Sequence, residues 1–183
     1  MKKIFLVLFI FLTVCLPNGN AIGDDAPYVP NPEWVIKGDS MAWGLANKWV
    51  GAENDGQPGY AVQTLRIDDR YLDKAVLMAG ANNFLCWHEA VEKTIEEYAA
   101  YYNTIKAGRI YCVGIPKIDT SWGGNILPEI KKLNTAIKHI CGPHHYIDTW
   151  KTPFTSNDGL HPDDTMNDWI IQEILDKDSK IQK

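Results

Sequence analysis

A serine, an aspartate and a histidine in this 183-residue chain are the residue types that can activate a hydroxyl nucleophile. Ser40 ends the segment Gly38-Asp39-Ser40 after an apolar run, and Asp158 and His161 lie three residues apart far downstream. In such a triad the histidine takes the hydroxyl proton and later returns it to the leaving group, while the carboxylate orients and stabilises the imidazolium. The combination predicts attack on an acyl carbon, with Ser40 as nucleophile, His161 as base and Asp158 as orienting carboxylate.

Short apolar segments alternate with longer amphipathic ones, which is typical of a parallel sheet covered by helices on both faces. The patterns predict strands at 34–36, 74–79, 109–115 and 145–148, and helices at 41–50, 87–105, 127–140 and 162–175. In such sheets ligands gather at the carboxyl ends of the strands. Ser40 and the segments 80–83 and 158–161 each follow a strand or precede a helix at that end. The predicted fold class is therefore α/β, a three-layer α/β/α sandwich with a central parallel sheet.

Four short motifs occur in order along the chain: Gly38 to Ser40, Asn54 to Gly59, Gly80 to Asn83 and Asp158 to His161. In this order they resemble the sequence blocks of the SGNH (GDSL-type) hydrolases, a family of esterases and lipases. Each motif alone is a weak signal, since Asp39-Ser40 could simply cap the helix that follows. Four motifs in order, each at a predicted strand end, form a joint signal. The resemblance implies one catalytic domain with the flavodoxin-like fold of that family over residues 22–183.

The resemblance also implies a role for each matching residue. Ser40 corresponds to the nucleophile, His161 to the general base and Asp158 to the orienting carboxylate. The oxyanion hole would consist of the backbone N–H of Ser40, the backbone N–H of Gly59 and the side-chain amide of Asn82. Preorganised neutral donors of this kind stabilise the negative charge of a tetrahedral intermediate, and losing one of them costs about 2.7–4 kcal/mol.

One position departs from the family's pattern. Asn83 stands where the family usually has aspartate. The position lies outside the triad, so activity is expected to survive while the local loop geometry adapts. The substitution nevertheless bears on how the neighbouring Asn82 is held.

The first 21 residues have the pattern of a secretory signal peptide. Two lysines precede an apolar run from Ile4 to Leu16, and Gly19 and Ala21 form a small-x-small cleavage site. The run is shorter than a membrane-spanning helix requires, and Val14 stands where a lipoprotein box has a small residue, so neither a retained membrane anchor nor a lipid anchor is predicted. The expected mature protein, residues 22–183, is exported to the periplasm or secreted.

Composition and cysteine spacing restrict the partners. The formal net charge is −5, and it falls to about −7 in the expected mature protein because the signal segment holds two lysines and no acids. No basic cluster remains, which argues against nucleic acid or an anionic membrane as a partner. No Cys-x-x-Cys or His-x-x-x-His pair occurs, so no metal and no cofactor is predicted. Cys86, Cys112 and Cys141 allow one disulfide with a free thiol, or three thiols.

The sequence thus predicts a serine ester hydrolase that acts through an acyl-serine intermediate. About 13 residues separate Ser40 from the second motif, which leaves little material for a lid. A small acyl ester is therefore the expected substrate: an acetylated carbohydrate, a lysophospholipid or a thioester. Two alternatives remain open. One is an O-acyltransferase of the same type, in which a sugar hydroxyl replaces water, and the other is a non-catalytic carbohydrate-binding protein of the same fold.

Overall fold

A computed structural model describes residues 32–122 and 126–181. The predicted signal peptide, residues 1–21, lies outside the described residues. A five-stranded sheet forms the centre in the order β2-β1-β3-β4-β5, with every neighbouring pair parallel. The strands are β1 (Trp34–Gly38), β2 (Glu53–Gly56), β3 (Leu72–Met78), β4 (Ala107–Val113) and β5 (Tyr146–Ile147). This strand order is the flavodoxin-like one, so the predicted α/β fold with a parallel sheet is confirmed.

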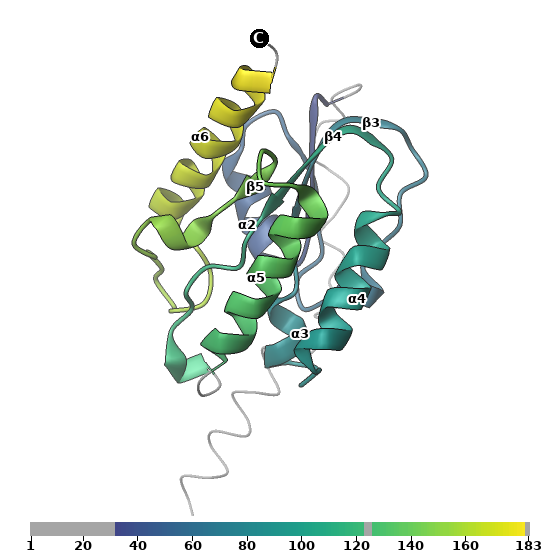
Figure 1. Ribbon diagram of the computed structural model, residues 1–183. Coiled ribbons are helices and arrows are strands. Elements are labelled where there is room, and N and C mark those ends of the chain that lie inside the picture. The colour runs from purple at the N-terminus through teal and green to yellow at the C-terminus, as the bar shows by residue number, and fades with distance from the viewer. Residues whose placement is uncertain (1–31, 123–125, 182–183) are drawn as a thin grey trace, which may run out of the picture.

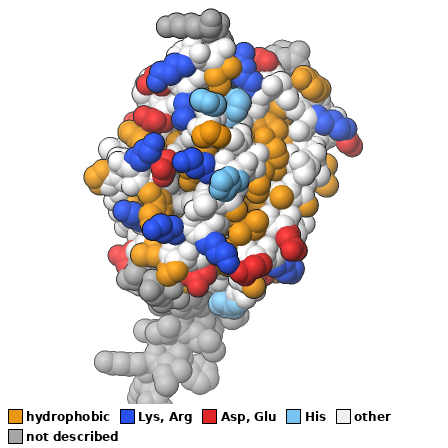
Figure 2. All heavy atoms as spheres, viewed as in Figure 1, with side chains coloured by type: hydrophobic (Ala, Val, Ile, Leu, Met, Phe, Trp, Pro, Cys, Tyr) orange, Lys and Arg blue, Asp and Glu red, His pale blue; other side chains and the backbone are white. Residues whose placement is uncertain are grey.

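Helices cover both faces of the sheet (Figure 1). They are α2 (Ser40–Lys48), α3 (Ala81–Leu85), α4 (Val91–Tyr102), α5 (Leu127–Cys141) and α6 (Asp164–Ile181), with single 3-10 turns at η1 (Val62–Thr64), η2 (Thr120–Trp122) and η3 (Thr149–Lys151). α4 and α5 pack side by side on one face, and α2 packs with α6 on the other. Among the helices in the described part of the chain, none combines the length and the apolar character that a membrane span requires. Acidic and basic side chains are interspersed on the face viewed in Figure 2.

Most predicted elements are present, with two informative differences. The edge strand β2 was not predicted, because its sequence Glu-Asn-Asp-Gly has none of the apolar alternation that marks a strand. β2 is a strand because its backbone pairs with β1, not because of its residue types. The helix predicted over 87–105 is wrong at its beginning, since α3 occupies 81–85 and α4 starts only at Val91.

The two central strands are buried on both faces, as expected for a parallel sheet between helix layers. All five residues of β1 are buried, and β3 is buried except at Asp73. Gly38 ends β1 with φ +141°, and a Cβ at this position would lie 1.9 Å from the carbonyl oxygen of Met78. Only glycine therefore permits β1 and β3 to end side by side. This junction is the topological switch point of the sheet, where the chain leaves β1 toward one edge and β3 toward the other.

Buried charges attach α6 to the sheet. The Asp178 carboxylate accepts hydrogen bonds from Lys74 Nζ and from the Tyr111 hydroxyl, each at 2.8 Å, and it also contacts Arg109. Lys74 lies on β3, and the other two residues lie on β4. These contacts fix the carboxyl-terminal part of α6 against β3 and β4.

Candidate active site

Ser40, His161 and Asp158 meet at the carboxyl edge of the sheet although Ser40 and His161 are 121 residues apart. His161 Nε2 lies 2.9 Å from Ser40 Oγ, and His161 Nδ1 lies 2.7 Å from Asp158 Oδ2. A neutral imidazole whose Nδ1–H donates to the carboxylate presents Nε2 as an acceptor for the serine hydroxyl. This arrangement can move a proton from Ser40 to His161 while the developing positive charge faces Asp158.

Asp39 holds Ser40 at the beginning of α2. Its buried carboxylate caps the helix by accepting from the backbone N–H of Met41 at 3.0 Å, and its other oxygen accepts from the N–H of Gly80 at 3.2 Å. Burial raises the pKa of Asp39 to about 6, although these hydrogen bonds and the charge of His161 act in the opposite direction. Asp39 therefore fulfils the capping role, which leaves the Ser40 hydroxyl for His161.

The Asp158 side chain is fixed by its own loop. Its Oδ1 accepts from the backbone N–H groups of Leu160 and His161, each at 2.8 Å. Partial burial raises the pKa of Asp158, but the hydrogen bonds from the side chain and backbone of His161 outweigh it and hold the pKa well below its usual range. The carboxylate is thus ionised at neutral pH. Its charge is available to an imidazolium.

A neighbouring segment supports this loop from outside. Trp122 Nε1 donates to the carbonyl oxygen of Asp158 at 2.6 Å, and the N–H of Asp119 donates to the carbonyl of Gly159 at 2.7 Å. Leu160 is 4% exposed and anchors the loop in the core. Sequence reasoning missed this support, because no pattern connects segment 119–122 with a loop almost 40 residues away.

The second motif lies next to Ser40 because its loop is tied to β1 and α2. The N–H of Gln57 donates to the carbonyl of Gly38 at 2.8 Å. A Cβ at Gly56 would lie 2.4 Å from the backbone nitrogen of Trp43 in α2, so this close approach requires glycine. The end of β2 is thereby held against the first turn of the helix that carries Ser40.

Each of the three predicted oxyanion donors has an N–H group available for a substrate. No hydrogen bond among the described residues uses the backbone N–H of Ser40 or of Gly59. A Cβ at Gly59 would meet no atom within 4 Å, so this residue faces open space. Asn82 donates one amide hydrogen to the carbonyl of Tyr60 at 3.0 Å, which orients the amide and leaves its second hydrogen available.

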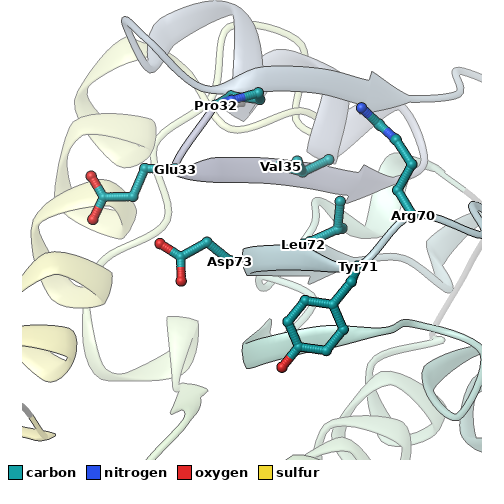
Figure 3. A pocket seen from close by; sticks show the side chains of 7 residues that line it. All are labelled: Pro32, Glu33, Val35, Arg70, Tyr71, Leu72 and Asp73. Carbon is teal, nitrogen blue, oxygen red and sulfur yellow. The ribbon is translucent and has the colours of Figure 1, made fainter. Parts of the chain in front are cut away.

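The candidate site is open to solvent. The side chains of His161 and Asp158 are 37% and 46% exposed. A cavity of about 470 Å³ between Pro32, Glu33, Val35 and residues 70–73 lies at the opposite, amino-terminal end of β1 and β3 (Figure 3), so it is separate from the triad. In residues 32–122 and 126–181 no group of three or more histidine, cysteine or acidic side chains is placed to hold a metal ion. Cys112 and Cys141 are free and buried.

No family model and no curated protein sequence matches the chain. Solved structures do share its fold. A member of the lipolytic protein G-D-S-L family from Veillonella parvula is 15% identical over 78% of this chain and 96% of its own, with a TM-score of 0.61. A lipase/acylhydrolase from Enterococcus faecalis is 20% identical over 79% and 93%, with a TM-score of 0.64. A carbohydrate acetylesterase from Sinorhizobium meliloti is 14% identical over 81% and 98%, with a TM-score of 0.59. At these identities the comparisons establish the α/β fold.

Proposed function

We propose that this chain is a serine ester hydrolase of the SGNH type. The observation that carries the proposal is the continuous relay from Ser40 Oγ through His161 to Asp158, with contacts of 2.9 and 2.7 Å. A pure binding protein has no need of all three groups in this order. The chain shares its fold with structures named as a lipase/acylhydrolase and a carbohydrate acetylesterase, which supports ester hydrolysis as the reaction.

The first half of the proposed reaction acylates Ser40. The hydroxyl oxygen attacks the ester carbonyl while His161 Nε2 takes its proton, and Asp158 stabilises the imidazolium through Nδ1. The carbonyl oxygen becomes negatively charged and accepts hydrogen bonds from the N–H of Ser40, the N–H of Gly59 and the second amide hydrogen of Asn82. Collapse of this intermediate breaks the bond to the alcohol, which leaves with the proton from His161.

The second half releases the acyl group. Water attacks the acyl-serine while His161, now neutral again, takes a proton from it. The same three donors hold the second oxyanion, and Ser40 leaves with the proton that His161 returns. The exposed positions of His161 and Asp158 give water free access to the acyl-enzyme, which favours hydrolysis over transfer to another alcohol.

We further propose that the substrate is a small acyl ester and, first among the candidates, an acetylated carbohydrate. In the described part of the chain the triad is open to solvent, and the connection after Ser40 is short, which favours a small acyl group over a long acyl chain. Structures named as a carbohydrate acetylesterase, a family 3 carbohydrate esterase and an acetyl xylan esterase share the fold. A lysophospholipid or a thioester is the competing substrate class.

Hydrolysis of p-nitrophenyl acetate by the purified mature chain tests the reaction. Ser40→Ala should remove the activity, whereas Ser179→Ala on the exposed side of α6 is the matched control and should retain it. Equal rates for the wild type and Ser40→Ala would refute the mechanism. Acyl chains of increasing length and acetylated xylo-oligosaccharides then rank the substrates, and product analysis with an added acceptor alcohol separates a hydrolase from a transferase.

Export is part of the same proposal. Cleavage after Ala21 would release the catalytic chain from its leader, as the sequence pattern predicts. Amino-terminal sequencing of the protein recovered from the periplasm or medium should begin at Ile22.

A further inference from the structure

Asn83, the residue that departs from the SGNH pattern, lies in a closed hydrogen-bond network. It is fully buried, and its Oδ1 accepts from the backbone N–H of Val62 at 3.1 Å. Its Nδ2 lies 2.8 Å from Glu89 Oε2 and 3.1 Å from both Glu97 Oε2 and Gln63 Oε1. An amide nitrogen carries two hydrogens, so one of them is shared between two of these acceptors. Position 83 therefore faces two carboxylates and needs a donor.

One lysine and two glutamates surround this amide. Lys93 Nζ lies 3.1 Å from Glu89 and 3.3 Å from Glu97, and the amide of Gln63 donates to Glu89 at 2.7 Å. Burial and the neighbouring Glu89 raise the pKa of Glu97. Burial opposes ionisation of Glu89 too, but hydrogen bonds from Asn83 and Lys93 outweigh it and lower the pKa of Glu89. Glu97 is thus the weaker acid of the two, and Asn83 is a donor that both carboxyl groups share.

The network is continuous with the predicted oxyanion donors. Asn83 follows Asn82 directly in α3, and its backbone carbonyl accepts from the N–H of Glu89 at 2.8 Å. The N–H of Val62, bound by Asn83, is two residues from Tyr60, whose carbonyl accepts from the Asn82 amide. Asn83 thereby fixes both sides of the contact that orients Asn82. It touches none of the reacting atoms itself.

We propose that Asn83 is a positioning residue for the oxyanion hole, and that Glu89 and Glu97 make an amide necessary where the family has aspartate. The proposal rests on the ester hydrolysis proposed above. An aspartate at position 83 would retain the acceptor for Val62 but place a third carboxylate beside two others. The segment that contains Tyr60 and Val62 would then move away from α3, and the Asn82 amide would lose the contact that orients it. Exchanging the amide of Asn83 and the carboxylate of Glu97, which share a hydrogen bond, should restore the orientation of Asn82.

The variants Asn83→Asp, Glu97→Gln and Asn83→Asp/Glu97→Gln test this pairing. Loss of a whole oxyanion donor lowers kcat by about 10²–10³, and we expect misplacement in Asn83→Asp to lower kcat about 10- to 100-fold with little change in KM. The affinity for a boronic acid that forms a tetrahedral adduct with Ser40 should fall in parallel, because it depends on the same donors. The double variant should regain most of the lost kcat.

A second measurement does not depend on turnover. The ¹⁵N–¹H resonances of the Asn82 side chain should shift in Asn83→Asp and return in the double variant. Asn134→Asp is the matched control, since Asn134 is also buried and its amide bonds both backbone groups of Ile115 at 2.8 Å. It should lower stability but leave the Asn82 resonances and the kcat of the folded protein unchanged.

The outcomes separate the two proposals. Unmoved Asn82 resonances, or a double variant that is folded yet no more active than Asn83→Asp, would overturn the positioning role. If Asn83→Asp does not fold, a folded and active double variant supports the pairing, and one that is unfolded or inactive overturns it. Absence of hydrolysis by the wild type would instead overturn the proposed function, while the resonances still decide the role of Asn83.

Discussion

Asp39 should make the protein less stable as the pH rises from 4 to 7. Its carboxylate is 1% exposed, and burial raises its pKa to about 6 from an ordinary value of 3.8. The folded state therefore binds the proton more tightly than the unfolded chain does. Between these two pKa values the folded carboxyl is protonated and the unfolded one is ionised, so each rise in pH favours unfolding. Above about pH 6 both states are ionised, and the effect levels off.

The size of the effect follows from the interval between the two pKa values. One pH unit corresponds to about 1.4 kcal/mol, so Asp39 should remove about 3 kcal/mol in total from the free energy of unfolding, of which about 2.4 kcal/mol is lost between pH 4 and pH 7. Carboxylates such as Asp158 and Asp178, whose pKa values are lowered on folding, act in the opposite direction. The wild-type profile is the sum of these effects, and a variant is needed to isolate Asp39.

Asp39→Asn supplies that comparison, because its side chain stays neutral and keeps an acceptor for the N–H of Met41. Urea denaturation at half-unit intervals from pH 4 to pH 8 gives the free energy of unfolding of both proteins. The wild-type value minus the variant value should fall by about 2.4 kcal/mol across this range. Asp69→Asn, at an exposed carboxylate, controls for the loss of one negative charge. A difference that stays constant or grows with pH would refute the reasoning.

Two further substitutions test the site and its support. Asp158→Asn places an amide donor opposite Nδ1, stabilises the wrong tautomer of the imidazole, and should lower kcat about 10⁴-fold without unfolding the protein, as measured by steady-state kinetics and circular dichroism. Asp55→Asn removes the main partner of Lys37, which is 1% exposed and retains only a 3.7 Å contact with Asp68 among the described residues. The free energy of unfolding in urea should fall by about 3–5 kcal/mol, and a loss below about 1 kcal/mol would contradict the reasoning that Lys37 depends on this buried ion pair.

Sequence patterns predicted the strands whose apolar residues are packed on both sides. β1, β3 and β4 carry such runs because a central parallel strand must be apolar on both faces. The edge strand β2 could not be predicted in this way, since its Glu-Asn-Asp-Gly sequence is ordered by pairing with β1 and by Lys37 binding Asp55. α3 was missed for a similar reason: five residues are too few for a helical period to be recognised.

The residues of the candidate triad could be recognised in the sequence, because the chemistry restricts their types to serine, histidine and a carboxylate. The contact between Ser40 and His161 could not be predicted from spacing, because the two residues are 121 positions apart and come together through the folded sheet and the contact of Trp122 with the Asp158 loop. The sequence also marked Asn83 as a departure without a reason. The reason that we propose lies in Glu89 and Glu97, whose carboxylates contact Asn83 only in the folded chain. The residue types determine which chemistry a site can perform and can be read from the sequence. Hydrogen bonds between distant segments form only when folding brings their atoms within about 3 Å, so they depend on the tertiary structure.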